Sequence, residues 1–152
     1  DTLTFDDHVC RIISLSSQSL YALRVLRSHG LEGAALWDVT RATLVSKMLY
    51  ASPVWWGSIT AAAKQRLQSL LSKLQRVGFL PQQFSTFAEL CVQADRSLFA
   101  SVISNPAHVL ASLLPPIRCT GYDLRKRAHD HLIPRADSIM RRNFIIRMLY
   151  AF

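Results

Sequence analysis

The stretch SITAAAKQRLQSLLSKLQRVG, residues 58–78, decides the fold class of this chain. Its apolar side chains recur three and four residues apart, which is the spacing of one face of an α-helix. Ser58 or Thr60 can cap the start of this helix, and Gly78 can end it. The stretch therefore predicts an amphipathic helix whose apolar face consists of Ala63, Leu67, Leu70, Leu71, Leu74 and Val77.

The same helix carries a row of basic side chains beside its apolar face. Arg66, Lys73 and Arg76 line one flank, and no acidic residue occurs between positions 58 and 78. A basic flank suits the phosphate backbone of a nucleic acid, because such contacts are electrostatic and independent of sequence. An ordinary solvated helix face produces the same pattern. Both interpretations stand at this point.

A second amphipathic helix is predicted upstream, over residues 5–29. Thr4 can cap this helix and Gly30 can stop it. At ~100° per residue, its apolar stripe lies within about 60° of Phe5 on a helical wheel. The stripe consists of Val9, Ile12, Ser16, Leu20, Leu23 and Leu26.

Two adjacent aspartates, Asp6 and Asp7, stand behind Phe5 and raise the question of catalysis. Polymerases that copy nucleic acid hold their catalytic metals with paired aspartates in a tight turn between two short apolar strands. Here the pair opens a long helix, where the helix dipole favours anions, and its members point ~100° apart. The position predicts a helix-start feature and not a metal site.

The segment that joins these two helices is rich in apolar and aromatic residues. It predicts a helix over about 34–51 that is apolar on most sides, which favours burial between layers. Pro53 breaks this helix, and Trp55, Trp56 and Gly57 close it. The two tryptophans are core anchors at a helix end or, less commonly, a platform on which bases stack.

From Pro81 onwards the predicted elements become short. Thr86 and Glu89 form a capping box for a helix near 87–94, Asp95 caps a second over 96–104, and Asn105 opens a third over 106–114. A looped path follows, and a last short helix is predicted over 138–150. The sequence thus predicts a mostly α fold: a helical bundle over 1–80, a short-helix region over 81–116 and a loop-rich basic tail over 117–152.

The charge of the chain is basic and unevenly distributed. The 152 residues carry 18 Lys and Arg against 10 Asp and Glu, a net charge of +8. Residues 118–152 hold 8 of the basic and 3 of the acidic side chains, so the tail is the most basic part. A basic balance favours an anionic partner. In the tail, Arg125, Lys126 and Arg127 are candidate phosphate contacts, although they can instead pair with Asp123 or Asp130.

Signatures of catalysis, membrane insertion and secretion are missing from the sequence. No Gly-rich phosphate loop, metalloprotease motif or nucleophile elbow occurs, and no apolar run reaches the ~18 residues of a membrane span. Cys119 with His129 and His131 is a weak zinc candidate, because the spacing matches no common finger. The odd number of cysteines, 3, favours a reducing compartment, so we expect an intracellular protein, nuclear or cytoplasmic.

The tail and the front of the chain together resemble a known family. Several short motifs of the tail are similar to the C-terminal end of non-LTR (LINE-type) retrotransposon reverse transcriptases of ticks and other invertebrates. They are Asn105-Pro106 with His108, Leu113 to Pro116, Tyr122 with Leu124-Arg125 and Arg127, His129, and Asn143-Phe144 with Arg147 to Tyr150. LTFDDHV resembles the segment that follows the palm in these polymerases, and YASPVWWG resembles their thumb signature. The likeness covers nearly the whole chain in the right order.

The resemblance implies a thumb and C-terminal extension of an RNA-directed DNA polymerase. In this family the metal-binding aspartates, the palm, the fingers and any endonuclease lie upstream of the matching region. The chain begins with Asp1, so we expect a fragment. The implied partners are template–primer RNA or DNA and the missing palm and fingers, without a membrane. The implied parent enzyme uses Mg, whereas we expect no cofactor and no activity in this part alone.

Two other functions remain open on the sequence alone. The apolar residues make up 50% of the chain, which suits a small helical scaffold that binds another protein through an apolar patch. A truncated transposon copy without a present role would have the same sequence. Nucleic-acid binding weakens steeply with salt, whereas an apolar interface does not, so salt separates the first two functions.

Overall fold

The structure, a computed structural model, describes residues 5–117 and 129–151. Helices make up most of this part of the chain, and its only β-type pairing is an isolated bridge between Ile117 and His131. The predicted mostly α fold is therefore confirmed. Within the described ranges, no helix combines the length and apolar character needed to cross a bilayer.

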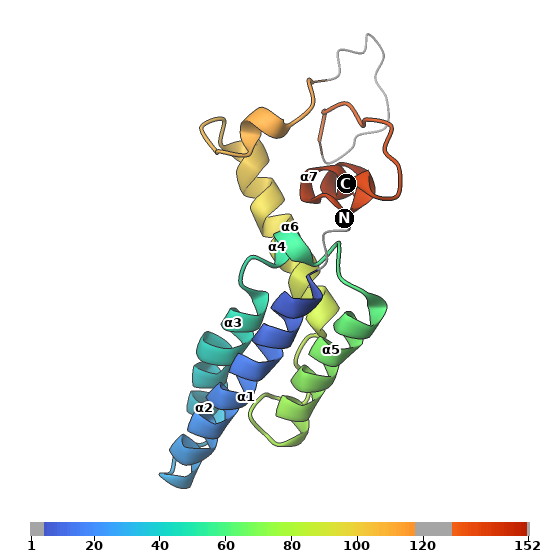
Figure 1. The fold of residues 1–152 in the computed structure, drawn as a ribbon. Coiled ribbons are helices and arrows are strands. Elements are labelled where there is room, and N and C mark those ends of the chain that lie inside the picture. Colours follow the sequence, from blue (N-terminus) through green and yellow to red (C-terminus); the bar gives the residue numbers. More distant parts are fainter. Residues whose placement is uncertain (1–4, 118–128, 152) are drawn as a thin grey trace.

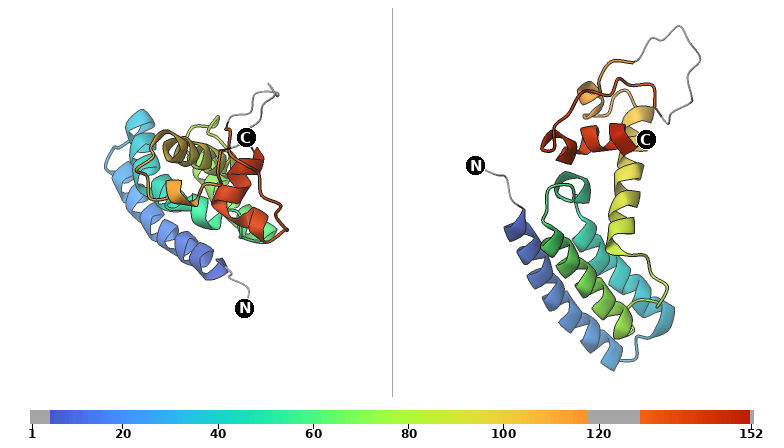
Figure 2. Two further views of the ribbon diagram at one scale, coloured as in Figure 1. Left: turned by 90° about the horizontal axis from the view of Figure 1, so that it is seen from above. Right: turned by 90° about the vertical axis from the view of Figure 1, so that its right-hand side faces the viewer.

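Three long helical segments lie side by side and form the main bundle (Figures 1 and 2). The first is α1 (Asp6–Ser28), close to the predicted range 5–29. The second runs without a break through α2 (Gly33–Thr40), the π-helical turn η1 (Arg41–Val45) and α3 (Ser46–Leu49). The third is α5 (Ala61–Arg76). Their apolar faces meet in one core that contains Val9, Ile12, Leu23, Leu44, Met48, Leu67, Leu71 and Leu74.

Local signals in the sequence explain both ends of α5. The Thr60 side chain accepts a hydrogen bond from the Ala63 amide at 3.2 Å, so Thr60, and not Ser58, is the cap. Gly78 has a φ of +83°, which an L side chain rarely adopts, and the Phe79 amide then donates to the Leu74 carbonyl at 2.9 Å. The predicted helix is confirmed in place. Four of the six residues of its predicted apolar face are buried, and Leu70 and Val77 are partly buried against the same core.

The short helix α4 (Ser52–Trp55) connects the second and third segments of the bundle. Ala51 before it has a φ of +51°, and Pro53 lies in its first turn, so the chain turns sharply after Tyr50. Trp55 is only 2% exposed, and its indole donates to the Tyr50 carbonyl at 3.1 Å. The predicted helix break near Pro53 is confirmed.

The long helix α6 (Phe87–Ser104) corrects the prediction of two short helices. Thr86 and Glu89 form both bonds of the predicted capping box. Asp95, however, is no cap, because it lies inside the helix and is 2% exposed. No Gly or Pro interrupts residues 87–104, and the buried residues Cys91, Phe99 and Val102 continue one apolar face past Asp95. The helix therefore continues without a break.

The helix predicted over 106–114 is also wrong. This segment instead makes tight turns after Asn105, and the short 3₁₀ helix η2 (Ala111–Leu113) follows them. The Asn105 side chain accepts from the Ala107 amide at 3.0 Å, and the Asn105 carbonyl accepts from the His108 amide at 2.9 Å. Such local bonds compete with an α-helix for the same backbone groups.

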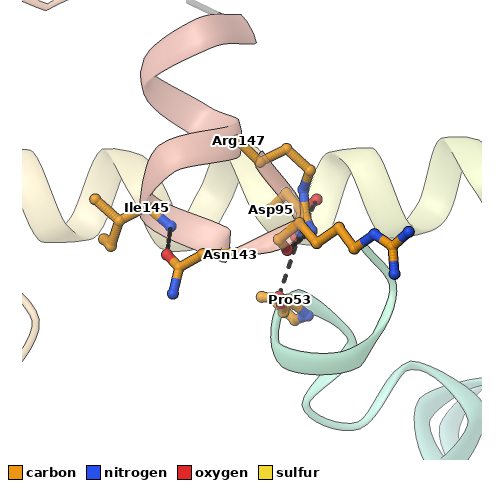
Figure 3. Close-up of polar contacts among 6 residues, drawn as sticks. Pro53, Asp95, Asn143, Ile145 and Arg147 are labelled. Carbon is orange, nitrogen blue, oxygen red and sulfur yellow. Dashed lines mark hydrogen bonds and ion pairs between the residues drawn. The ribbon is translucent and has the colours of Figure 1, made fainter. Parts of the chain in front are cut away.

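The last predicted helix, over 138–150, forms in two parts. The 3₁₀ helix η3 (Met140–Arg142) precedes α7 (Phe144–Ala151), and Asn143 separates them. Its side chain accepts from the Ile145 amide at 3.0 Å and thereby caps α7 (Figure 3). Helix α7 packs beside α6, away from the main bundle (Figure 1), in a second core of Phe99, Phe144, Ile145, Met148 and Leu149.

Candidate nucleic-acid interface

Asp6 and Asp7 lie in the first turn of α1, as predicted. Thr4, the predicted cap, lies outside the described residues. The turn between two strands that a catalytic pair requires does not occur at this position, because the aspartates begin a helix of 23 residues. The geometry thus gives the pair the role of first-turn anions that interact with the helix dipole.

The three basic residues predicted on the flank of α5 are all exposed. We call Arg66, Lys73 and Arg76 the basic strip. The Arg66 Nη1 atom lies 3.5 Å from the Sγ atom of Cys10 on α1, so this side chain reaches across the boundary between the two helices. Within residues 5–117 and 129–151, none of the three forms an ion pair with a carboxylate. Their charge is available to an external anion.

The other three predicted phosphate contacts, Arg125, Lys126 and Arg127, lie outside the described residues. The structure therefore gives them no position relative to the basic strip, and they stay a prediction. The same holds for Cys119 of the weak zinc candidate. Among the residues that the structure describes, no group of three His, Cys, Asp or Glu side chains is placed to hold a metal ion.

The two histidines of that zinc candidate make contacts within the protein. His129 is 6% exposed, its Nε2 atom lies 3.1 Å from the Leu149 carbonyl oxygen, and its Nδ1 atom accepts from the His131 amide at 3.2 Å. The Nδ1 atom of His131 lies 2.7 Å from the Pro115 carbonyl oxygen. The Nε2 atom of His129 thus ties the preceding loop to α7, and its Nδ1 atom is occupied by a backbone amide of the same loop.

The two adjacent tryptophans, Trp55 and Trp56, act mainly as core anchors. Trp55 stacks on Phe87 with ring centroids 6.4 Å apart. Trp56 is half-buried and packs edge-on against Phe87, with ring centroids 5.6 Å apart. The Lys64 ammonium lies 4.7 Å from the centroid of the Trp56 ring. The anchor interpretation is confirmed for Trp55, whose burial leaves no ring face for a base.

A buried ion pair that sequence reasoning missed joins α6, α7 and α4. The Arg147 Nη2 atom lies 2.8 Å from Asp95 Oδ2, and it also donates to the Pro53 carbonyl at 3.3 Å (Figure 3). Its Nη1 atom donates to the Arg142 carbonyl at 3.2 Å. A lone acidic residue on the apolar face of a helix was the available signal, because such a residue needs a buried cation.

Burial shifts the pKa of two side chains in this joint. It raises the pKa of Asp95, and the neighbouring Arg147 guanidinium opposes this shift. Burial also raises the pKa of the Cys91 thiol to about 12. Cys91 therefore stays protonated at neutral pH and is a packing residue, because the thiolate is the reactive form.

The cysteine chemistry gives a first prediction. In a Cys119→Ser background at pH 8, iodoacetamide should modify exposed Cys10 while Cys91 remains intact, because roughly one Cys91 in ten thousand is a thiolate at a pKa of about 12. Mass spectrometry after timed quenching gives the two rates, and the unfolded chain in guanidinium is the control. Equal native rates would contradict the burial of Cys91.

The raised pKa of Cys91 also makes its contribution to stability depend on pH. The folded-state pKa of Cys91 lies above its ordinary value of 9.0, so the unfolded chain loses this proton first as the pH rises. The contribution of Cys91 to the free energy of unfolding is therefore complete below pH 9 and decreases towards pH 12. A Cys91→Ala variant should lack this part of the alkaline loss.

Comparison of the chain with protein families, with curated proteins and with solved structures finds no match. The fold and the site therefore define only a class: a mostly helical protein with an exposed basic strip beside a well-packed helical core.

Proposed function

We propose that this chain is the thumb and C-terminal extension of a non-LTR retrotransposon reverse transcriptase and that it holds template–primer nucleic acid through phosphate contacts. The observation that carries the proposal is the basic strip. Arg66, Lys73 and Arg76 are exposed on one helix, and none pairs with a described carboxylate. The family resemblance of the sequence supports the same function.

The packing of α5 suits a phosphate-binding helix. Four buried side chains, Ala63, Leu67, Leu71 and Leu74, fix the helix in the core, so the strip has a stable position. Cations that replace condensed counterions along a nucleic-acid backbone gain affinity from the release of those counterions. Such contacts position a duplex without reading its sequence, which is what a polymerase thumb requires.

Catalysis in this proposal belongs to a palm domain outside the chain. Residues 1–152 should therefore show no primer extension on an RNA template with Mg²⁺ or Mn²⁺. An Asp6→Asn/Asp7→Asn variant should match the wild-type chain in this assay. Extension by the purified chain that this variant abolishes would show that the aspartate pair is catalytic and would overturn the assignment.

A protein-binding scaffold is the second candidate, and exposed apolar residues favour it. Val109, Leu113, Ile117 and Ile139 are 84%, 62%, 64% and 72% exposed, and all lie in the C-terminal part of the chain. Contiguous exposed apolar surface marks binding sites for other proteins. The basic strip plays no part in this second function, so substitutions in the strip separate the two candidates.

The test is binding of the full chain to a labelled RNA–DNA heteroduplex, measured by fluorescence anisotropy. Arg66→Gln/Lys73→Gln/Arg76→Gln should weaken binding on the order of 100-fold at 0.1 M salt, because three phosphate contacts are lost. The loss should be about equal for unrelated sequences. Helix content by circular dichroism should not change, since the three side chains are exposed. Unchanged affinity would favour the scaffold function.

A matched control replaces three exposed, uncharged side chains of the same helix, so that the net charge does not change. Gln65, Ser69 and Ser72 are exposed on the same helix. Their combined replacement by Ala should leave the heteroduplex affinity within about twofold, because they carry no cation to exchange for counterions.

A further inference from the structure

The sequence contains three places where an arginine precedes a serine by three residues. They are Arg11 with Ser14, Arg66 with Ser69, and Arg135 with Ser138. Arginine-directed protein kinases recognise this spacing, because acidic side chains in their substrate cleft pair with the guanidinium while the serine hydroxyl reaches the ATP. A leucine or an isoleucine follows each serine and suits an apolar pocket beside the reacting hydroxyl. The sequence alone does not distinguish the three serines.

The structure separates them, because only Ser138 lies outside a helix. Ser14 lies inside α1 and Ser69 inside α5, helices of 23 and 16 residues whose apolar faces belong to the main core. Ser138 is exposed in a turn between residues 132–137, which form no helix or strand, and the 3-residue helix η3. A kinase cleft binds its substrate as an extended chain. Such a chain is available from a loop at little cost, whereas a packed helix must first unfold.

The groups that a kinase would contact lie at the surface of this loop. Arg135 is exposed, and Ile139 is 72% exposed. The Asp137 Oδ1 atom fixes the turn, since it accepts from the amides of Ile139 at 2.9 Å and Met140 at 2.7 Å. The Ser138 hydroxyl forms no hydrogen bond with the part of the chain that the structure describes. It is therefore free to react.

We propose that Ser138 is a phosphorylation site for an arginine-directed serine/threonine protein kinase. The Ser138 Oγ atom attacks the γ-phosphorus of Mg-ATP, and the bond from this phosphorus to the oxygen that bridges to the β-phosphate breaks. The hydroxyl proton passes to the catalytic aspartate of the kinase, and ADP leaves. This inference does not depend on the proposed function, because it uses neither the basic strip nor a nucleic acid.

A phosphate at Ser138 has cationic partners close by in the sequence. Arg135, Arg141 and Arg142 lie within four residues of it, and all three are exposed. Phosphate oxygens form charge-assisted hydrogen bonds with guanidinium groups, so the loop can accept the modification without burying a charge. The Arg141 guanidinium lies 4.7 Å from the centroid of the Tyr150 ring on α7. Pairing of Arg141 with the phosphate competes with this contact, so the modification acts on the junction between the loop and α7.

The test is incubation of the full chain with Mg-ATP and the catalytic subunit of cyclic-AMP-dependent protein kinase, an arginine-directed enzyme. Phosphopeptide mass spectrometry gives the rate at each serine. Ser138 should react at least about tenfold faster than Ser14 or Ser69, because the two long helices rarely open. Synthetic peptides of residues 8–18, 63–73 and 132–142 are the matched controls. All three should be phosphorylated, because a short peptide has no packed fold that protects its serine.

Variants of the full chain test the recognised side chain. Arg135→Ala should slow the phosphorylation of Ser138 by about tenfold or more, because an acidic group of the kinase cleft then loses its partner. Arg142→Ala removes an exposed arginine outside the recognised spacing and should leave the rate within about twofold. Ser138→Ala should remove the phosphate and leave the circular dichroism spectrum unchanged, which excludes a loss of fold as the cause.

Three results would overturn the inference. If the peptide of residues 132–142 is phosphorylated and Ser138 of the folded chain is not, the loop is closed to the kinase. Equal rates at the three serines of the folded chain would show that the helices give no protection. An unchanged rate in Arg135→Ala would exclude arginine-directed recognition. Since heteroduplex binding by the basic strip is measured separately, this inference and the proposed function can fail independently.

Discussion

Arg147→Met should lower the free energy of unfolding by about 3–5 kcal/mol, because it leaves the Asp95 carboxylate buried without its cation. The two side chains meet at 2.8 Å, and Asp95 is nearly inaccessible to water. Typical domains have about 5–15 kcal/mol of stability, so the variant should be partly unfolded or close to it. Urea denaturation followed by circular dichroism measures the change.

The control for this prediction is Arg142→Met, five residues earlier and exposed. Its side chain makes no contact that the structure gives, so its replacement should change stability by less than about 0.5 kcal/mol. A second variant, Asp95→Asn/Arg147→Met, removes both charges and should recover part of the loss. A full loss in the double variant would mean that packing of the Arg147 stem, and not its charge, holds the joint.

The loss of stability caused by Arg147→Met should be smaller at acidic pH. Burial raises the pKa of Asp95, and Arg147, which opposes this shift, is gone in the variant. The folded-state pKa of Asp95 therefore lies above its unfolded value of 3.8. The contribution of protonated Asp95 to the free energy of unfolding is complete below pH 3.8, and it is lost as the pH rises through the folded-state pKa. The variant should therefore recover stability relative to the wild type as the pH falls towards 4.

Gly57→Ala should have an effect of similar size through the same joint. A Cβ atom at Gly57 would lie within 2.5 Å of the Arg142 carbonyl oxygen, and it would overlap the Arg147 guanidinium. The guanidinium can move, but it then leaves Asp95, and the backbone carbonyl cannot yield cheaply. We expect a loss of about 2–4 kcal/mol, from overpacking together with the weakened ion pair.

A double-mutant cycle tests whether these two effects share one cause. In an Arg147→Met background the guanidinium is absent, so Gly57→Ala should cost roughly half as much as in the wild type. Ser69→Ala, an exposed change on α5, is the control and should be nearly neutral. Full additivity of the Gly57 and Arg147 effects would contradict the close approach at Gly57.

The elements that the sequence predicts correctly are those whose signals are local. The apolar spacing of Leu67, Leu71 and Leu74 and the capping box of Thr86 and Glu89 lie within a few residues of each other, and the structure confirms both. The exposure of the basic strip follows from the same helical spacing. Periodicity gives the face of a helix, and capping residues give its ends.

The features that the sequence did not predict depend on distant partners. Asp95 resembles a helix cap until Arg147, 52 residues later, supplies its charge partner, and only the folded chain brings them together. Asn105 and Asn143 replace helical turns by side-chain bonds whose outcome depends on the packing around them. The contact between Arg66 and Cys10, which lie on α5 and α1, likewise requires the bundle.

The salt dependence of heteroduplex binding tests the central claim most directly. For phosphate contacts, the logarithm of affinity falls linearly with the logarithm of salt concentration, with a slope of about −0.9 for each contact in a duplex. The wild-type chain should show a steep slope, and Arg66→Gln/Lys73→Gln/Arg76→Gln should reduce it by about 2–3. A wild-type slope near zero, or an identical slope in the variant, would contradict phosphate binding by the basic strip.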